Sequence, residues 1–338
     1  MAKYCIGIDL GGTFTKFGLM DESGRVSSMF QIPTVLDKGG EGLIDLIVLG
    51  GNRLMSQRSL TRDDVLGIGI GSPGPISIKR GMILMLPNIP GMENLALCDL
   101  VSRRMNLPVV LENDANAAAY GEYLCGAGKG VSDMVMLTLG TGIGSGIIIE
   151  GRIHHGRHEI GAELGHMIVE ADGEKCNCGQ LGCLERYSSA TFLTLYAARL
   201  LQSDSRPSVL REMTKSGQAL DARHIVQAHK QGDEVATQVW LRAMKFLAIG
   251  CINICRIFDP DEIVLAGGLV NAGSDLLDPL TKLYESMHWK LTGVMTPIKL
   301  ARLGSDAGVI GAAGVAWTAL GSGPPDCSAH LDEPRNEK

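Results

Sequence analysis

The alternation of apolar and polar positions predicts that the chain opens with a meander of three strands, Tyr4–Leu10, 14–20 and 25–32. Short turns that contain glycine separate these strands. Apolar residues at helical spacing follow in residues 42–56, and a short apolar strand covers residues 65–70. Strands followed by a helix that packs across them indicate an α/β fold.

A second run of the same kind begins near the middle of the chain. Residues 133–139 read as a strand, a Gly/Thr turn follows, and residues 145–150 read as another strand, which repeats the plan of the opening hairpin. The remaining expected elements are helices at 92–106, 115–126, 188–202, 233–257 and 306–320, and strands at 108–112 and 262–266.

This duplication predicts two related α/β lobes. We expect a small lobe of residues 1–117 with 306–320 and a large lobe of residues 118–305. A length of 338 residues is sufficient for two medium domains. The polar residues 321–338, rich in Gly, Pro, Asp and Glu, are expected to be a disordered tail.

Composition narrows the possible partners. A net charge of −6 argues against a nucleic-acid or anionic-membrane surface, because such partners attract clustered Lys and Arg. The longest uncharged run, residues 134–149, contains four glycines and is shorter than the roughly 20 residues of a spanning helix. The first residues enter a strand without the pattern of a signal peptide, so a cytoplasmic location and a small-molecule substrate are expected.

Two Gly/Thr loops that are each bracketed by strands predict a phosphate site. Backbone N–H groups around glycine can form a concave nest for phosphate oxygens. A single loop of this kind is more simply a tight turn, but two loops and a later Gly-Gly step are what a bound nucleotide needs. The candidate residues are Gly11, Gly12, Thr13 and Lys16 in the first loop, Gly140, Thr141 and Gly142 in the second, and Gly267 and Gly268 after a strand. Asp9, which ends the first strand, is a candidate ligand for Mg²⁺.

The pair Asn113-Asp114 stands at the start of an Ala-rich helix. A carboxylate in this position can accept a proton from a hydroxyl while a bond to phosphorus forms. Asn and Asp also commonly cap helices. From these residues alone a helix cap is the simpler interpretation, and because the two roles are compatible, a general base at Asp114 stays open.

His166, Cys176, Cys178 and Cys183 have the spacing of a closed zinc site. One imidazole and three thiolates complete a tetrahedral set without an open position, which predicts a structural ion. Nine cysteines, an odd count with three close together, argue against a disulfide framework. The other six, expected to be separate packing or surface thiols, are Cys5, Cys98, Cys125, Cys251, Cys255 and Cys327. His154, His155 and His158 are expected to lie in a solvated loop with Glu159, which has no assigned role.

Three motifs carry a family resemblance. DLGGTFTK, LGTGIGSG and IVLAGG resemble the two phosphate motifs and the adenosine motif of the sugar kinase, hexokinase and actin superfamily. The resemblance implies two RNase-H-like lobes, with mixed sheets flanked by helices and an active-site cleft between them. ELGH at 163–166 and CNCGQLGC at 176–183 resemble the signature of its ROK branch, and the whole chain is most similar to the bacterial glucokinases of that family.

The resemblance also implies an activity and a set of roles. The reaction is ATP-dependent phosphorylation of glucose at the 6-hydroxyl, with Mg²⁺ and a structural Zn²⁺. Asp114 is the catalytic base, and sugar contacts come from Asn113, Glu163, His166 and Glu185; Ser72, Gly74 and Asn88 are expected to line the sugar pocket. N-acetylmannosamine, N-acetylglucosamine or fructose could replace glucose, polyphosphate could replace ATP, and a non-catalytic sugar sensor is the other alternative. A homodimer is the family's usual assembly.

Overall fold

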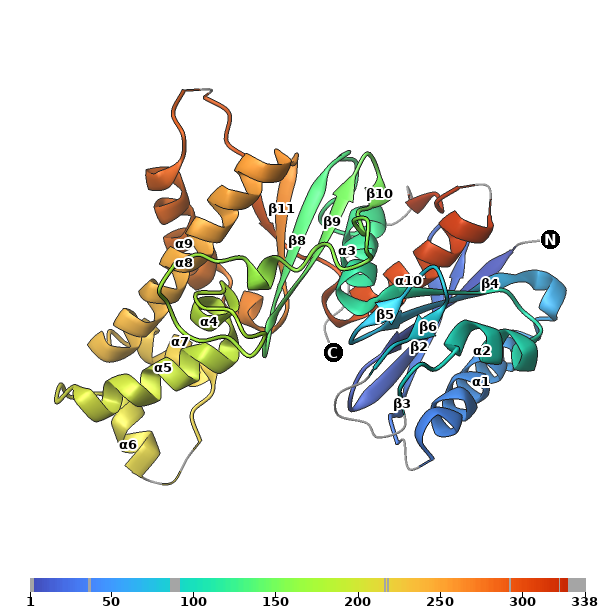
Figure 1. The fold of residues 1–338 in the computed structure, drawn as a ribbon, viewed down its shortest axis with the longest axis horizontal. Helices are drawn as coiled ribbons and strands as arrows, with labels where there is room; N and C mark the ends of the chain where they lie inside the picture. Colours follow the sequence, from blue (N-terminus) through green and yellow to red (C-terminus); the bar gives the residue numbers. More distant parts are fainter. Residues whose placement is uncertain are drawn as a thin grey trace. The chain divides into compact units, whose positions relative to one another are not determined.

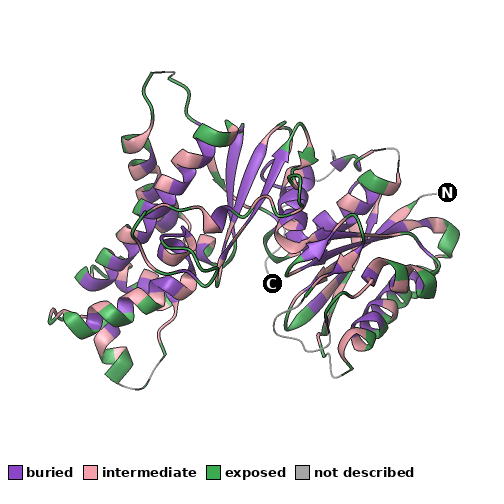
Figure 2. Ribbon diagram, viewed as in Figure 1, coloured by how far each residue is buried: buried purple, intermediate pink, exposed green. Residues whose placement is uncertain are grey.

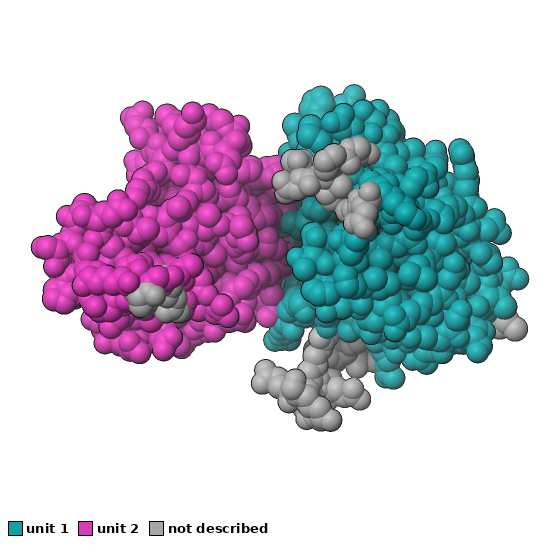
Figure 3. Space-filling model, turned by 90° about the horizontal axis from the view of Figure 1, so that it is seen from below, with its two compact units in different colours: residues 1–131, 146–161, 302–338 teal, residues 132–145, 162–301 magenta. Residues whose placement is uncertain are grey.

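The structure is a computed structural model, and the residues it describes are 3–35, 38–85, 92–215, 217, 219–291, 293–321 and 323–327 (Figure 1). The chain divides into two compact units, coloured separately in Figure 3. Unit 1 comprises residues 1–131, 146–161 and 302–338, and unit 2 comprises residues 132–145 and 162–301. The lobe limits expected from the sequence, 1–117 with 306–320 and 118–305, stay a prediction.

The sheet of unit 1 has the strand order β3-β2-β1-β4-β7. β1, β2 and β3 form the antiparallel meander, and β4 and β7 run parallel to β1. The bounds are β1 Tyr4–Leu10, β2 Phe14–Asp21, β3 Val26–Pro33, β4 Val65–Ser72 and β7 Val109–Asn113. These strands confirm the opening plan expected from the sequence. Because β1, β4 and β7 are parallel, their carboxyl ends share one edge of the sheet.

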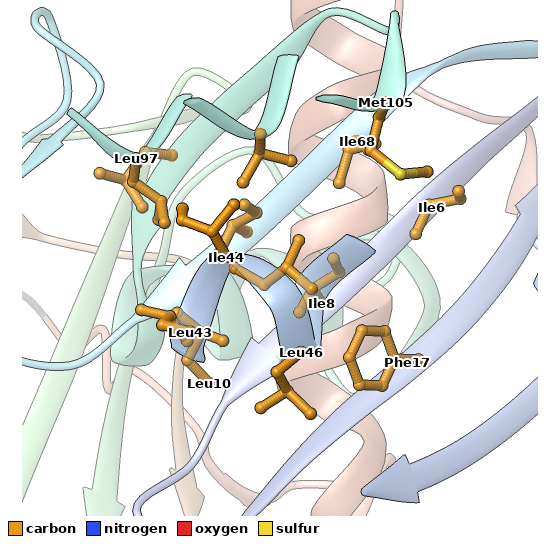
Figure 4. Packing of buried hydrophobic residues seen from close by; sticks show 14 of the residues in the cluster. Ile6, Ile8, Leu10, Phe17, Leu43, Ile44, Leu46, Ile68, Leu97 and Met105 are labelled. Atoms are coloured by element: carbon orange, nitrogen blue, oxygen red, sulfur yellow. The ribbon is translucent and has the colours of Figure 1, made fainter. Parts of the chain in front are cut away.

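Alternate side chains of β1 face two different layers of helices, one on each side of the sheet. Ile6, Ile8 and Leu10 join the apolar core beneath α1 (Gly39–Gln57) and α2 (Leu97–Met105). Figure 4 shows Leu43 and Ile44 of α1 pointing toward these strand side chains. The alternating side chains of a strand point to opposite faces of a sheet, so the intervening positions of β1 are left for the second layer.

The second layer consists of α3 (Asp114–Cys125) and α10 (Ala307–Leu320), which pack against each other and against the sheet. α10 is buried almost all round, as its colour in Figure 2 shows, and therefore lacks an amphipathic pattern. A side chain at Gly311 would collide with the backbone carbonyl of Ala117 in α3. The absence of a side chain at this position allows the two helix backbones to approach closely.

One expected helix begins later than the sequence suggested. Residues 92–106 were expected to be helical, whereas α2 starts only at Leu97. Leu95 instead forms a bridge with Ile83 of β6 (Met82–Ile83), which pairs with β5 (Ile76–Ser77). Asn94 has a positive φ of 53°, which is incompatible with a right-handed helix.

Unit 2 contains most of the second sheet, whose order is β10-β9-β8-β11-β12. Its bounds are β8 Met134–Leu139, β9 Ile143–Ile149, β10 Arg152–Ile153, β11 Glu262–Ala266 and β12 Ile298–Leu300. β8 and β9 form a hairpin, and β11 runs parallel to β8. The order matches that of the first sheet, with a hairpin followed by parallel strands, which confirms the expected duplication.

Helices make up the rest of unit 2. They are α4 Glu185–Ser188, α5 Ala190–Ser203, α6 Val209–Lys215, α7 Ala222–Lys230, α8 Glu234–Phe258 and α9 Ser274–Met287. α5 and α8 confirm two expected helices, while α6, α7 and α9 were not foreseen. Within the described ranges, no helix combines the length and the apolar character that a bilayer span requires.

The expectation that Cys125 and Cys327 are separate thiols is wrong. The structure joins them in a disulfide between the end of α3 and the C-terminal segment. Asp326 N–H donates to the Glu22 carbonyl, and Cys327 is buried. The expectation of a disordered tail from residue 321 therefore fails for residues 323–327, whereas residues 328–338 lie outside the described residues. The sequence separation of 202 residues hid this pairing.

The contact between α3 and α10 leads to a stability prediction. Gly311→Ala places a methyl group against the Ala117 carbonyl, so we expect a loss of about 2 kcal/mol or more in the free energy of unfolding. Urea denaturation followed by circular dichroism would measure it. Gly12→Ala is the control, because a β-carbon there meets open space. Equal stability of the two variants would contradict the packing described here.

Candidate functional site

The first part of the candidate site lies at the shared carboxyl edge of the parallel strands in unit 1. Asp9 of β1 stands opposite Gly71 of β4, and Ser72 of β4 stands opposite Asn113 of β7. Asp114 begins α3 directly after β7. The register thus brings Asp9 and the Asn113-Asp114 pair to one edge, although about a hundred residues separate them in the sequence.

Asn113 is the N-cap of α3. Its Oδ1 atom accepts hydrogen bonds from the backbone N–H groups of Ala115 and Asn116, at 3.0 and 3.1 Å. The Asp114 Oδ1 atom accepts from Ala115 N–H at 2.8 Å. The helix cap that the sequence favours is therefore present, and it holds the carboxyl of Asp114 at the first turn of the helix.

Both carboxyl groups at this edge titrate abnormally. Burial, together with the negative charge of Asp114, raises the pKa of Asp9 to about 6, and Lys16 opposes the shift. Burial also raises the pKa of Asp114, against the lowering effect of the Ala115 N–H group. Two partly buried acids at one sheet edge are a donor set that suits a hard cation such as Mg²⁺, because such an ion would offset their negative charge.

The first Gly/Thr loop is held by contacts at its two ends. Thr34 Oγ1–H donates to the Gly11 carbonyl at 2.8 Å, and Thr34 N–H donates to the Thr13 carbonyl at 2.9 Å. Gly12 is exposed. Lys16, a candidate phosphate ligand, lies 3.6 Å from Asp306 Oδ1 and donates to the Ser305 carbonyl. Its nucleotide role stays a prediction, and the sequence did not indicate its acidic neighbour.

The other candidates of unit 1 lie in the segment after β4. Ser72 is fully buried, and its hydroxyl donates to the Pro73 carbonyl. Gly74 has a φ of +82°, which requires glycine or a strained residue. Asn88 lies outside the described residues. The contribution of these positions to a sugar pocket stays a prediction.

Two residues without an assigned role in the sequence make specific contacts. His155 Nε2 lies 2.7 Å from Glu112 Oε2, so this histidine does not belong to a merely solvated tract. Glu159 accepts hydrogen bonds from Ser77 Oγ and from Lys79 N–H. His154 and His158 are exposed, as expected. The partners lie more than forty residues away, which is why local sequence patterns did not reveal them.

The Gly/Thr loop of unit 2 contains two candidate residues that contact each other. Gly140 N–H donates to the Gly142 carbonyl, and Ile143 N–H donates to Glu185 Oε2 at 2.8 Å. A side chain at Gly142 would collide with the Glu185 carboxylate. Glu185 was expected at the sugar, and the structure places its carboxylate against the loop expected to bind phosphate.

A cavity of about 780 Å³ lies beside this loop, entirely within unit 2. Gly140, Thr141 and Gly268 line it as the sequence suggested. Gly267, with a φ of +89°, packs against the backbone of Leu139 and turns the chain into the cavity wall. The volume and the largely apolar lining fit a small organic ligand.

Helix α7 and its N-cap residue form one wall of the cavity, and the sequence motifs did not indicate these residues. Their contribution includes Asp221, Arg223, Gln227 and Lys230. Asp221 caps the helix by accepting from His224 N–H, and Lys230 pairs with Asp275 at 2.6 Å. The segment carries no glycine motif, so only its amphipathic helical pattern could have indicated it.

The four predicted metal ligands lie together in unit 2. Their ligand atoms are all within 4.8 Å of one another. His166 Nδ1 lies 3.6 Å from Cys176 Sγ, and Cys178 Sγ lies 3.6 Å from Cys183 Sγ. Tetrahedral zinc with Zn–S bonds of about 2.3 Å separates sulfur atoms by about 3.8 Å. The residues present therefore fit a zinc ion.

The loop that carries the cysteines has the turns that a compact cluster needs, while its electrostatics differ between the thiols. Hydrogen bonds from Gln180 lower the pKa of Cys178 to about 6, which favours its thiolate, whereas burial and the neighbouring cysteines raise the pKa of Cys183 to about 12, which a bound cation would oppose. Gly182 has a positive φ and packs against the Glu170 carbonyl, and Gly179 also has a positive φ. The positive φ values at these two glycines allow the short loop to turn back on itself.

The cluster leads to a prediction about metal content. Protein purified without chelators should contain zinc in a one-to-one ratio, measured by elemental analysis. Cys183→Ser should lose the zinc and lower the free energy of unfolding by about 2 kcal/mol or more, because the ion cross-links residues 166–183. Cys98→Ser, outside the cluster, is the matched control. A wild-type protein without bound metal would rule out a zinc site.

Similar proteins are found among glucokinases and among xylose repressors. A glucokinase of Thermotoga maritima is 36% identical over 94% of this chain and 98% of its own length. A xylose repressor of Caldicellulosiruptor bescii is 28% identical over 90% of this chain and 76% of its own length.

A solved structure supports the same relationship and the fold. The ROK family glucokinase of Streptomyces griseus, in complex with glucose and AMPPNP, superimposes with a TM-score of 0.74 and 35% identity, and covers 92% of this chain and 98% of that one. The two-lobed sugar kinase fold expected from the motifs is therefore confirmed. The ROK family model matches residues 5–319, and the chain belongs to the ROK family.

Proposed function

We propose that this protein is a hexose kinase that transfers the γ-phosphoryl group of ATP to the 6-hydroxyl of glucose. Sugar kinase is the broader function that the glucokinase relatives support. The observation that carries the proposal is the partly buried pair of acids, Asp9 and Asp114, which the parallel strands bring to one sheet edge of unit 1 and whose pKa values are both raised. Placing two partly buried acids at one edge is costly for a chain that serves only as a scaffold.

Asp114 is the proposed general base. As the hexose oxygen bonds to γ-phosphorus and the bond to ADP breaks, the hydroxyl proton passes to the Asp114 carboxylate. Burial raises the pKa of Asp114, which makes its carboxylate a stronger base. The Asn113 cap fixes the helix turn that carries it, so the acceptor is held in position before substrate binds.

Asp9 is the proposed ligand of Mg²⁺, directly or through water. Bound Mg²⁺ would neutralise phosphate charge as the phosphoryl group is transferred. Gly308, at the start of α10, leaves room for the Asp9 carboxyl, since a β-carbon there would lie 2.7 Å from Oδ2. A bound cation would favour the carboxylate form of Asp9 and so oppose the raised pKa.

The nucleotide and the sugar are assigned to separate residues. We place the adenosine in the cavity of unit 2, between α7 and Gly268, with its phosphates toward Gly140 and Thr141. Asn113, Glu163, His166 and Glu185 are the proposed sugar contacts. His166 directs Nδ1 toward the zinc ligands, which leaves Nε2 for a hydroxyl. Zinc would thereby stabilise the orientation of a sugar-binding ring.

The main alternatives differ in acceptor or in chemistry. Other acceptors are N-acetylmannosamine, N-acetylglucosamine and fructose, and polyphosphate is another possible donor. A non-catalytic sugar sensor is the second candidate function, supported by the similarity to a xylose repressor. A coupled assay of ADP release across these sugars, with mannose included, separates the alternatives, because a sensor binds sugar without releasing ADP. Assembly as a homodimer remains part of the proposal.

Removal of the proposed base gives the first test. Asp114→Asn keeps the size of the side chain and removes the proton acceptor, so we expect kcat to fall by roughly 10²- to 10⁴-fold while nucleotide binding persists. The coupled assay measures kcat, and calorimetry with an ATP analogue measures binding. Asp99→Asn, exposed in the first turn of α2, should match the wild type. Near-normal turnover in folded Asp114→Asn protein would refute the assignment.

The cavity in unit 2 gives the second test. Gly268→Leu should be tolerated by the fold, because a β-carbon there meets nothing within 4 Å, but its side chain enters the cavity. We expect the KM for ATP to rise at least roughly 10-fold, with a smaller change in kcat. Ala198→Leu, exposed on α5, is the control. An unchanged KM would place the nucleotide elsewhere.

A further inference from the structure

Glu112 is a buried acid one residue before the proposed sugar and base positions. It lies in β7 and is 2% exposed. Its Oε1 atom accepts hydrogen bonds from Asn113 N–H at 2.9 Å and from Asn116 Nδ2 at 3.0 Å. Glu112 therefore holds the chain on both sides of Asp114, once before it and once after it.

His155 is the partner of the second carboxylate oxygen of Glu112, Oε2. Its Nε2 atom lies 2.7 Å from Glu112 Oε2. A carboxylate removed from water is costly unless it is paired and hydrogen-bonded. When the imidazole is protonated, the two residues form a charge-assisted hydrogen bond, which is shorter and stronger than a neutral one. When the imidazole of His155 is neutral, it does not balance the negative charge of the Glu112 carboxylate.

The loop that presents His155 is itself anchored. Gly161 N–H donates to the His155 carbonyl at 3.0 Å, which closes residues 155–161 into a compact loop. On this loop Glu159 has a φ of +61° and accepts hydrogen bonds from Ser77 Oγ and Lys79 N–H. The loop that carries His155 is therefore also hydrogen-bonded, through Glu159, to the β5–β6 hairpin of the same unit.

We propose that protonated His155 is a positioning residue, which holds the Asn113-Asp114 turn in its reactive geometry through Glu112. This inference rests on the proposed function, since it gives Asp114 the role of base. His155 does not touch the substrate. Protonated His155 stabilises the negative charge of Glu112, and Glu112 holds the Asn113-Asp114 turn through hydrogen bonds. His155 thus orients a catalytic group indirectly, through a residue that contacts the same turn.

The charged groups around His155 determine the direction of its pH dependence. The hydrogen bond that His155 donates to Glu112 raises the pKa of His155, and burial opposes this shift. The charges of Glu112 and Glu159 also raise the pKa of His155, and the charge of Lys79 lowers it. Since the folded-state pKa lies above the ordinary value of about 6.5, the pair is fully present at lower pH. It is lost as pH rises through the folded-state pKa, so turnover should fall on the alkaline side.

The decisive variant is His155→Gln, in which the amide keeps a hydrogen-bond donor near Glu112 but cannot titrate. With glucose, ATP and Mg²⁺ saturating, we expect wild-type kcat to decline toward high pH. His155→Gln should have a kcat lower by roughly 10-fold near neutrality and no such decline, because the turn is permanently less well held. His158→Gln, an exposed histidine of the same loop, should keep the wild-type profile.

A second variant tests whether the two residues act as one unit. Glu112→Gln should also lower kcat, and the double variant should be no worse than about twofold below the more severe single one, because both changes disrupt the same contact. Additive losses would show that His155 acts by another route and would overturn the proposal.

Hydrogen exchange provides a readout that does not depend on turnover. Exchange of the amides in residues 113–116 should accelerate in His155→Gln and in wild-type protein at high pH, after correction for intrinsic rates, and should be unchanged in His158→Gln. Exchange in α8 of unit 2 serves as a check of folding. Unchanged exchange and an unchanged pH profile in His155→Gln would overturn the proposal. If no hexose is phosphorylated by the wild type, the proposed function fails, and exchange still decides whether His155 orders the turn.

Discussion

The cost of removing carboxyl groups from water governs unit 1. Glu122 of α3 is fully buried and accepts hydrogen bonds from the backbone N–H groups of Ala127 and Leu303. Glu112 is compensated by neighbouring amides and by His155. At the carboxyl edge of the sheet, burial raises the pKa values of Asp9 and Asp114. Glu112 and Glu122 accept the hydrogen bonds that hold the chain around α3, whereas Asp9 and Asp114 are the acids to which we assign the proposed chemistry.

The packing of α10 determines how close the Asp9 carboxyl lies to the core of unit 1. α10 contacts α3 and the strands β1 and β4, and its glycines permit that approach. Gly308 faces the Asp9 carboxyl, so the same helix forms part of the core and part of the wall around the acid that we propose as a Mg²⁺ ligand. A change in this helix therefore affects stability and the site together, because the two share atoms at their boundary.

In unit 2 the cysteine cluster and the Gly/Thr loop are connected through one carboxylate. Glu185 follows Cys183 by two residues and accepts a hydrogen bond from Ile143 N–H. A zinc ion at the cluster, as predicted, would therefore order the segment from which Glu185 reaches the loop. A closed set of four ligands suits this structural task, since it leaves no position for a substrate.

Local patterns in the sequence predicted the longer strands of both sheets, the repeated hairpin and the cluster of one histidine and three cysteines, because each depends on residues that are neighbours in the chain or nearly so. They did not predict the short strands β10 and β12. The sequence also indicated Asp9 and Asp114 as candidate site residues, but the effect of the Asp114 charge on the pKa of Asp9 required the parallel register of β1, β4 and β7. Only the tertiary structure decided the pairing of Cys125 with Cys327, the partner of His155 and the place of α7 beside the cavity. These features join segments that lie far apart in the chain, and a pairing of that kind leaves no periodicity or spacing in the sequence from which it could be inferred.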